Sequence, residues 1–454
     1  VGKRQDWNGS RESAILLRKV FGFAIAVWSK PACWFSGMRQ LAGAGVRSGG
    51  AIRCQPLAVS KDASAPYTLN QQTGSSQNAS KLAYSTAYLM EDSTMSSLNR
   101  RTFLKQVSVG VGALPLLAGG GGWSEAPVKR PNVLLIITDD QGYGDLSCHG
   151  NTLLKTPNMD RLHAESVRFT HFNVCPVCSP TRSSIMTGRY NYRTGIVDTY
   201  AGRSMMDPSE KTLAELLGAA GYRTGIFGKW HLGDNYPLRP IDRGFQEALV
   251  HYGGGIAQPS DPEYYERKDT YFNPVLEHNG VREKSTGYCT DVFTDAALKF
   301  IAERGDTPFF AYVPYNAPHT PLEVPDKDAA PFRAAGLEEN LANLYGMIAN
   351  EDANIGRLLD ALDAAGIAGE TLVIFMTDNG AQSLGKGVER FNAGLRDWKG
   401  SPYDGGIRVP FFVRWPEGFQ GGRDVDRIAA HIDIAPTLLE ICGRSEEHTS
   451  ELQS

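Results

Sequence analysis

Two pairs of oxygen-bearing side chains stand directly behind apolar runs that are expected to form buried strands. Asp139 and Asp140 follow one run, and Asp378 and Asn379 follow the other. Charged groups at the end of a buried strand cost free energy unless they bind something. Four such residues suit a hard cation, so the pattern predicts a site for Ca²⁺ or Mg²⁺. Either pair taken alone could instead cap the helix or turn that follows it.

Cys178 begins a second pattern, Cys-Ser-Pro-Thr-Arg, which ends at Arg182 and is followed by Thr-Gly-Arg at 187–189. Because Cys175 lies three residues earlier, the two cysteines also form C-x-x-C, so a redox pair or a structural thiol is an alternative. A redox pair normally opens a helix in a small thioredoxin-like unit, and it leaves the rest of the pattern unexplained. We therefore favour a role for Cys178 that uses the whole pattern.

Three further patterns contain basic side chains that could act on an anion. Lys229 and His231 belong to Gly-Lys-Trp-His-Leu-Gly, His319 has a proline on either side, and Lys399 belongs to Trp-Lys-Gly. Prolines around a histidine fix the backbone, which suits a positioned general acid. Taken alone, Lys229 could be a solvated lysine and His231 a core histidine. His319 could likewise belong to an ordinary proline-rich loop.

In their order along the chain, these patterns resemble the signatures of the type I, formylglycine-dependent sulfatase family, in its arylsulfatase-like, bacterial form. The resemblance covers about Pro131 to Cys442. It implies that a maturation enzyme oxidises Cys178 to formylglycine, whose hydrated aldehyde is the nucleophile. It also implies that the four residues at the strand ends bind calcium.

The resemblance assigns roles to the basic residues as well. Arg182 would hold the formylglycine, while Lys229 and Lys399 would bind sulfate oxygens. His231 would accept a proton from the formylglycine diol, and His319 would protonate the leaving alcohol oxygen. The sulfate would then leave by elimination, which regenerates the aldehyde.

The implied reaction is hydrolysis of aryl or carbohydrate sulfate monoesters, and no pattern selects one sulfated small molecule or glycan. Thr181 stands where many members of the family have Ser, and Asp404 stands where Glu is common. A related phosphonate monoester or phosphodiester hydrolase with the same formylglycine is an alternative function. A third alternative is an inactive fragment whose cleft only binds anions. Residues 253–255 and 264–272 lie in the region expected to shape the cleft.

The elements that must position these residues alternate between apolar strands and helices. This order predicts an α/β sandwich with a mostly parallel central sheet, helices on both faces, and a site beyond the carboxyl ends of the strands. The resemblance implies that the sandwich is alkaline-phosphatase-like and that the family's smaller C-terminal subdomain is largely absent. We expect strands at 132–138, 222–227, 308–314, 371–377 and 409–414. We expect helices at 157–165 with Thr156 as N-cap, 209–220 with Ser209 as N-cap, 291–303, 341–365 and 431–442.

Both ends of the chain are expected to lie outside the catalytic domain. Residues 1–94 show no helical or strand period and are interpreted as disordered, non-native upstream translation. Residues 95–126 place two adjacent arginines before an uncharged stretch, which resembles a twin-arginine signal peptide. The sulfatase catalytic domain is expected at 127–443, incomplete at its C-terminus. Residues 444–454 resemble the translation of a sequencing adapter.

Composition and charge limit the classes of partner that are expected. The 454 residues are 41% hydrophobic and 21% charged with a net charge of −4, which gives no reason to expect nucleic acid. The uncharged stretch of the signal is too short for a membrane span, so no stable membrane insertion is expected after processing. The expected partners are the sulfated substrate, the maturation enzyme and the twin-arginine translocase, and the expected location is periplasmic or secreted.

Overall fold

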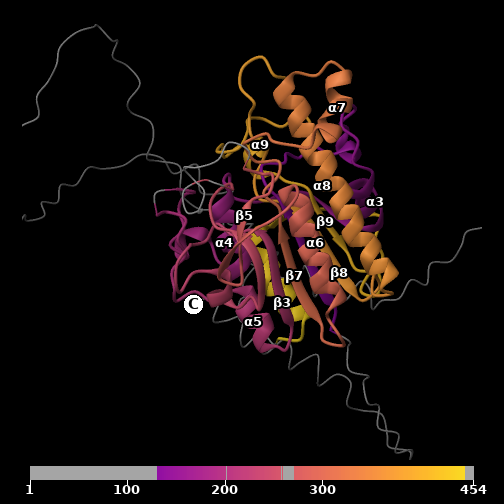
Figure 1. Ribbon diagram of the computed structural model, residues 1–454. Helices are drawn as coiled ribbons and strands as arrows, with labels where there is room; N and C mark the ends of the chain where they lie inside the picture. Colours follow the sequence, from indigo (N-terminus) through magenta and orange to yellow (C-terminus); the bar gives the residue numbers. More distant parts are fainter. Residues whose placement is uncertain (1–129, 201, 257, 259–269, 445–454) are drawn as a thin grey trace, which may run out of the picture. The chain divides into compact units, whose positions relative to one another are not determined.

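The computed structural model describes residues 130–200, 202–256, 258 and 270–444 (Figure 1). The expected upstream translation and signal peptide, and residues 445–454 of the expected adapter segment, lie outside this part. None of the helices in the described part combines the length and the hydropathy that a membrane crossing requires.

A ten-stranded sheet organises the described residues, in the order β10-β2-β9-β8-β1-β7-β3-β4-β5-β6. Its centre consists of five parallel neighbours: β8 (Thr371–Thr377), β1 (Asn132–Thr138), β7 (Phe309–Pro314), β3 (Arg223–Lys229) and β4 (Glu247–His251). One side continues with β9 (Phe411–Arg414), β2 (Val167–Asn173) and β10 (Arg423–Ala430), and the other with β5 (Val275–His278) and β6 (Val281–Lys284). The predicted mostly parallel sheet is confirmed.

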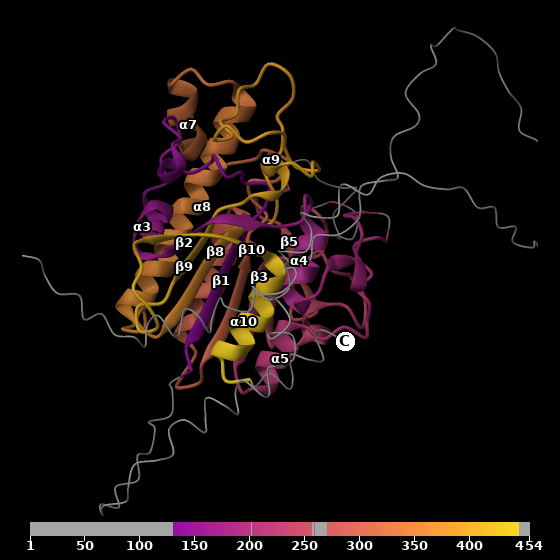
Figure 2. The same cartoon turned by 180° about the vertical axis from the view of Figure 1, so that it is seen from behind.

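Helices cover both faces of the sheet because its central strands are apolar on both sides. In β1, Leu134 and Ile136 join one core while Val133, Leu135 and Ile137 join the other, as the two-residue period of a strand requires. The first core is covered by α3 (Pro157–Glu165), α6 (Cys289–Ala302) and α8 (Glu339–Ala364). The second is covered by α4 (Cys178–Thr187), α5 (Leu213–Ala219) and α10 (Ile434–Ile441). Figures 1 and 2 show the α6–α8 layer and the α5–α10 layer on opposite faces, which confirms the sandwich.

Some expected boundaries are wrong for identifiable reasons. The helix expected from Ser209 begins at Leu213, because Thr212 Oγ1 accepts from the Glu215 amide at 3.1 Å while the Glu215 carboxylate accepts from the Thr212 amide at 2.9 Å. This reciprocal capping box satisfies two amides that would otherwise be unpaired at the helix start. Ser209 instead bonds to the carboxylate of Asp207.

Of two other helix starts, one matches the expectation in position and one does not. Thr156 precedes α3 as expected, but its side chain makes no capping hydrogen bond and pairs with Asp160 and Ser147. The helix expected from His431 opens with a 3₁₀ turn, His431–Asp433, before α10. Elements without any sequence expectation include α4, β2, β4, β5, β6, β10, α7 (Asp326–Ala334) and α9 (Asp404–Ile407).

Candidate active site and cation-binding side chains

The two acidic strand ends meet because β1 and β8 are parallel neighbours in register, with Thr138 opposite Thr377. Asp139 and Asp140 therefore emerge beside Asp378 and Asn379. The Asn379 amide group donates to Asp140 Oδ1 at 2.8 Å, and the Asp140 amide lies 3.4 Å from Asp378 Oδ1. All four side chains are buried. The structure thus brings together all four residues predicted to bind a metal.

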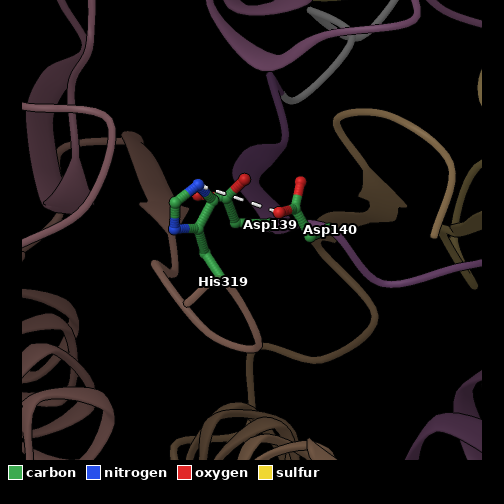
Figure 3. A group of neighbouring side chains, drawn as sticks. All are labelled: Asp139, Asp140 and His319. Carbon is green, nitrogen blue, oxygen red and sulfur yellow. Dashed lines mark ion pairs between the residues drawn. The ribbon is translucent and has the colours of Figure 1, made fainter. Parts of the chain in front are cut away.

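Three buried oxygens of this cluster have no hydrogen-bond partner among the described residues. They are Asp139 Oδ1, Asp140 Oδ2 and Asn379 Oδ1. Asp139, Asp140 and His319 also offer ligand atoms within 4.8 Å of one another (Figure 3). Buried oxygens without a partner are costly, and oxygen-rich donor sets are the ones that Ca²⁺ and Mg²⁺ prefer. The donor set therefore fits a hard divalent cation.

Three basic side chains from separate elements surround the carboxylates. Lys229 Nζ lies 2.5 Å from Asp139 Oδ2, and Lys399 Nζ lies 2.5 Å from Asp140 Oδ1. Arg182 reaches Asp378 Oδ2 with Nε at 2.9 Å and with a terminal nitrogen at 2.7 Å. The three positive and three negative groups balance, so a divalent cation would leave this cluster with a net positive charge. A buried cluster of that charge attracts an anion.

The buried charges alter one another's pKa values. Burial raises the pKa of Asp140, but the Lys399 ammonium, His319 and the Asn379 amide outweigh it and hold the pKa below its usual range. Burial and the neighbouring Asp139 raise the pKa of Asp378 to about 6, although the Arg182 guanidinium opposes the shift. The pKa values of the two groups differ because the carboxylates of Asp139 and Asp140 raise that of Asp378, whereas the neighbours of Asp140 lower its pKa.

Cys178 is the first residue of α4, a helix whose ten residues are all buried. Its Sγ lies 3.5 Å from His231 Nδ1. Burial raises the pKa of the Cys178 thiol, and nearby Lys229 and Lys399 oppose this shift. Cys175 is also a free thiol, and its Sγ lies 3.3 Å from His431 Nε2. The helix therefore presents position 178 to a histidine and two lysines.

His231 is oriented by hydrogen bonds of its main chain and of its ring. Its backbone is left-handed, with φ of 61°, and its carbonyl accepts from Ser179 Oγ at 2.7 Å. Nε2 lies 2.9 Å from the Thr199 carbonyl, so Nε2 must carry the proton that is donated there. Burial and then Lys229 lower the pKa of His231 well below its usual value. The neutral ring therefore presents the unprotonated Nδ1 to position 178, as a proton acceptor requires.

His319 faces the cluster from the loop after β7. Nδ1 lies 2.7 Å from the Thr320 carbonyl, and Nε2 lies 3.7 Å from Asp140 Oδ2, as the dashed line in Figure 3 marks. Burial lowers the pKa of His319 to about 4, although the Asp140 carboxylate opposes the shift. Cis peptide bonds precede Pro318 and Pro321 on either side of it.

The loop that carries Lys399 is tied to the other parts of the site by main-chain hydrogen bonds. The Lys399 amide donates to the Ala381 carbonyl at 2.9 Å, and the Gly400 amide donates to the Pro176 carbonyl at 2.8 Å. These bonds connect Lys399 to the end of β8 and to the segment before Cys178. Asp404 begins α9 and is exposed, and its carboxylate lies 3.9 Å from Arg408.

Arg390 is a site residue that the sequence reasoning missed. Its buried guanidinium forms a salt bridge with Asp145 and donates to the Asp140 carbonyl at 2.9 Å and to the Gln382 carbonyl at 2.6 Å. Asp140 has a left-handed backbone, with φ of 66°, which is unfavourable for a non-glycine residue. Arg390 therefore holds the strained turn that presents Asp140. No motif around Arg390 signals this role.

Glu351 on α8 is a second residue that the sequence reasoning missed. Its side chain is fully buried, and neither carboxylate oxygen has a hydrogen-bond partner among the described residues. Burial, then Asp139 and Asp145, raise the pKa of Glu351 well above its usual value. Burial therefore favours the protonated, uncharged form of this carboxyl group in the folded protein.

Comparisons with known proteins agree with this geometry. The family model described as Sulfatase matches residues 131–443. The chain is 32% identical to N-acetylgalactosamine-6-sulfatase of Mus musculus, over 75% of this chain and 67% of that protein. It is 31% identical to arylsulfatase A of Homo sapiens, over 70% of this chain and 65% of that protein.

Solved structures give the same result. The crystal structure of Ps i-CgsB in complex with k-i-k-neocarrahexaose is similar with a TM-score of 0.64 and 34% identity, over 71% of this chain and 74% of that one. The fold is therefore the expected alkaline-phosphatase-like one. The chain spans about two thirds of the length of the two curated relatives described above. The match to the family model covers most of the chain, and the chain belongs to the sulfatase family.

Proposed function

We propose that this protein hydrolyses sulfate monoesters of aryl or carbohydrate alcohols, with formylglycine formed from Cys178. One observation carries the proposal: Cys178 begins a buried helix within 3.5 Å of an unprotonated histidine nitrogen and beside two lysines. Formylglycine at this position would supply a hydrated aldehyde, whose hydroxyl attacks sulfur and whose second hydroxyl allows the sulfate to leave.

We also propose Ca²⁺ as the cation of the site. Asp139, Asp140, Asp378 and Asn379 would hold it, because three of their buried oxygens have no hydrogen-bond partner in the described part. The cation would add positive charge where the sulfuryl oxygens of the substrate gather. Calcium binding is measurable by titration calorimetry without any substrate.

The basic residues would stabilise charge and transfer protons. Lys229, Lys399 and Arg182 stabilise negative charge on the sulfuryl oxygens and on the nucleophile. His231 accepts a proton at Nδ1 from the group at position 178. His319 is the proton donor for the leaving alcohol oxygen, and the negative charge of a bound sulfate ester favours its protonated form.

The test is expression together with a maturation enzyme, followed by mass spectrometry of the peptide that contains Cys178. We expect the mass of formylglycine in that peptide and sulfate release from 4-nitrophenyl sulfate. Cys178→Ala, which removes only one small side chain atom, should keep the fold and release no sulfate. A fully converted protein that releases no sulfate from any aryl or carbohydrate ester would sink the proposal. Faster hydrolysis of phosphate diesters than of sulfate monoesters would favour the alternative hydrolase.

We further propose bacterial export to the periplasm or the medium, based on the twin arginines at 100–101. Residues 95–126 would act as the signal, 1–94 would be upstream translation, and 444–454 would not belong to the natural protein. Fusing residues 95–126 to a reporter protein tests export, since replacement of both arginines by lysine should keep the reporter in the cytoplasm.

A further inference from the structure

The site opens to solvent on the side of two of its residues. The side chains of Lys229 and Arg182 are 0% exposed, whereas those of His319 and Lys399 are 11% and 14% exposed. His319 is also the residue proposed to protonate the leaving alcohol. The alcohol part of the substrate must therefore lie beside His319, on the open side.

Two glycines after β4 lie against both catalytic histidines. An ideal Cβ on Gly254 would lie 3.2 Å from His231 Cε1, and one on Gly255 would lie 3.2 Å from His319 Nδ1. Such distances are tighter than ordinary van der Waals contacts, so a side chain at either position would press on a ring. The main chain of this segment therefore passes close to both rings.

The carboxamide of Gln258 lies close to the same two glycines. The main-chain amide of Gln258 donates to the Gly255 carbonyl at 3.1 Å, which closes a turn in the chain. Gln258 Oε1 is 2.8 Å from the ideal Cβ position of Gly254, and Nε2 is 3.1 Å from that of Gly255. The carboxamide is therefore within about 6 Å of both histidine rings, the sum of the two distances at each glycine. Gln258 is half-buried, so it can meet a ligand.

We propose that Gln258 binds a hydroxyl group on the alcohol part of the substrate, and that the substrate class is therefore carbohydrate sulfates. This inference rests on the proposed sulfatase function. A carboxamide can donate and accept at the same time, as can a sugar hydroxyl next to the ester. A plain aryl alcohol offers no such group and leaves the carboxamide unpaired. Sites that hydrogen-bond a hydroxyl discriminate strongly against ligands that lack it.

The test compares Gln258→Leu and Gln258→Asn with the formylglycine-containing wild type. The substrates are N-acetylgalactosamine 6-sulfate and galactose 4-sulfate as sugar probes, and 4-nitrophenyl sulfate as the probe without a hydroxyl. We expect Gln258→Leu to lower kcat/KM on the best sugar probe about tenfold or more, with less than a twofold change on 4-nitrophenyl sulfate. Gln258→Asn should recover part of the loss only on sugar probes. Gln420→Leu, which replaces an exposed glutamine beside Glu165, is the matched control and should change neither rate.

Each outcome decides the inference. Equal losses on both kinds of substrate would show a structural role and overturn it, as would no loss on either. A wild type that hydrolyses 4-nitrophenyl sulfate but neither sugar sulfate would also overturn it while leaving the sulfatase function intact. A fully converted wild type that hydrolyses none of the probes would instead overturn the proposed function, and this inference with it.

Discussion

The buried carboxyl group of Glu351 should make the stability of this protein fall as the pH rises. In the folded state its pKa is raised well above the usual value because the side chain is fully buried and lies near Asp139 and Asp145. An unfolded chain releases the proton near pH 4.3, whereas the folded chain keeps it to a higher pH. Above that pH the unfolded state binds fewer protons, so the free energy of unfolding decreases as pH increases.

Glu351→Gln isolates this effect because a carboxamide resembles the protonated carboxyl group in shape and cannot ionise. Near pH 4.3 the variant and the wild type should be almost equally stable. Above it, the variant should gain about 1.4 kcal/mol per pH unit, up to the folded pKa of Glu351. Two pH units within that range would correspond to about 2.7 kcal/mol, which is a large share of a typical folding free energy.

The assay is urea unfolding followed by tryptophan fluorescence, at pH 5, 6, 7 and 8 with one excess concentration of Ca²⁺. Glu389→Gln, which changes an exposed carboxyl group, is the control and should run parallel to the wild type. The reasoning fails if Glu351→Gln also runs parallel to the wild type over this range. Such a result would mean that Glu351 has the same proton affinity in the folded and unfolded chains.

Two further substitutions test the supports of the site and of a helix. In Arg390→Lys, the lysine cannot bond to Asp145 and to the Asp140 carbonyl together, so Asp140 is held less firmly. Calorimetry should therefore show Ca²⁺ binding weakened about 10- to 100-fold. The exposed Arg396→Lys should bind Ca²⁺ as the wild type does, and an unchanged affinity in Arg390→Lys would refute its positioning role. Thr212→Ala should lower the free energy of unfolding by about 1 kcal/mol through loss of the capping box. Ser209→Ala should change the urea midpoint little, and equal losses in both would contradict the observed helix start.

The sequence predicts β1 and β8 well because both strands are continuous apolar runs. The bounds of β1 and β8 match the expectation residue by residue, and the meeting of their acidic ends follows from parallel pairing. In contrast, α4 has no apolar stripe, since its serines, threonines and Arg182 are buried as completely as Ile185. A helix buried on every side has no periodicity to detect.

Long-range pairs explain the remaining gaps in the prediction. Arg390 and Asp145 are separated by 245 residues, and nothing near either residue signals that they pair. Glu351 occupies a buried position of α8, where the helical pattern predicts an apolar residue. A glutamate in a helix is ordinarily expected to be exposed, so the sequence does not reveal its burial. The start of α5 is a different case, because the Thr-x-x-Glu signal of a capping box was present at Thr212 and Glu215.

The complete burial of α4 sets an order of events for any enzyme that modifies Cys178. The thiol, Pro180 and Arg182 are all buried once the helix lies against the sheet. A modifying enzyme must bind this stretch in an extended or loosely held form, before the helix docks. Docking of α4 would therefore end the period in which such an enzyme could act, and mutations that speed this docking would shorten that period.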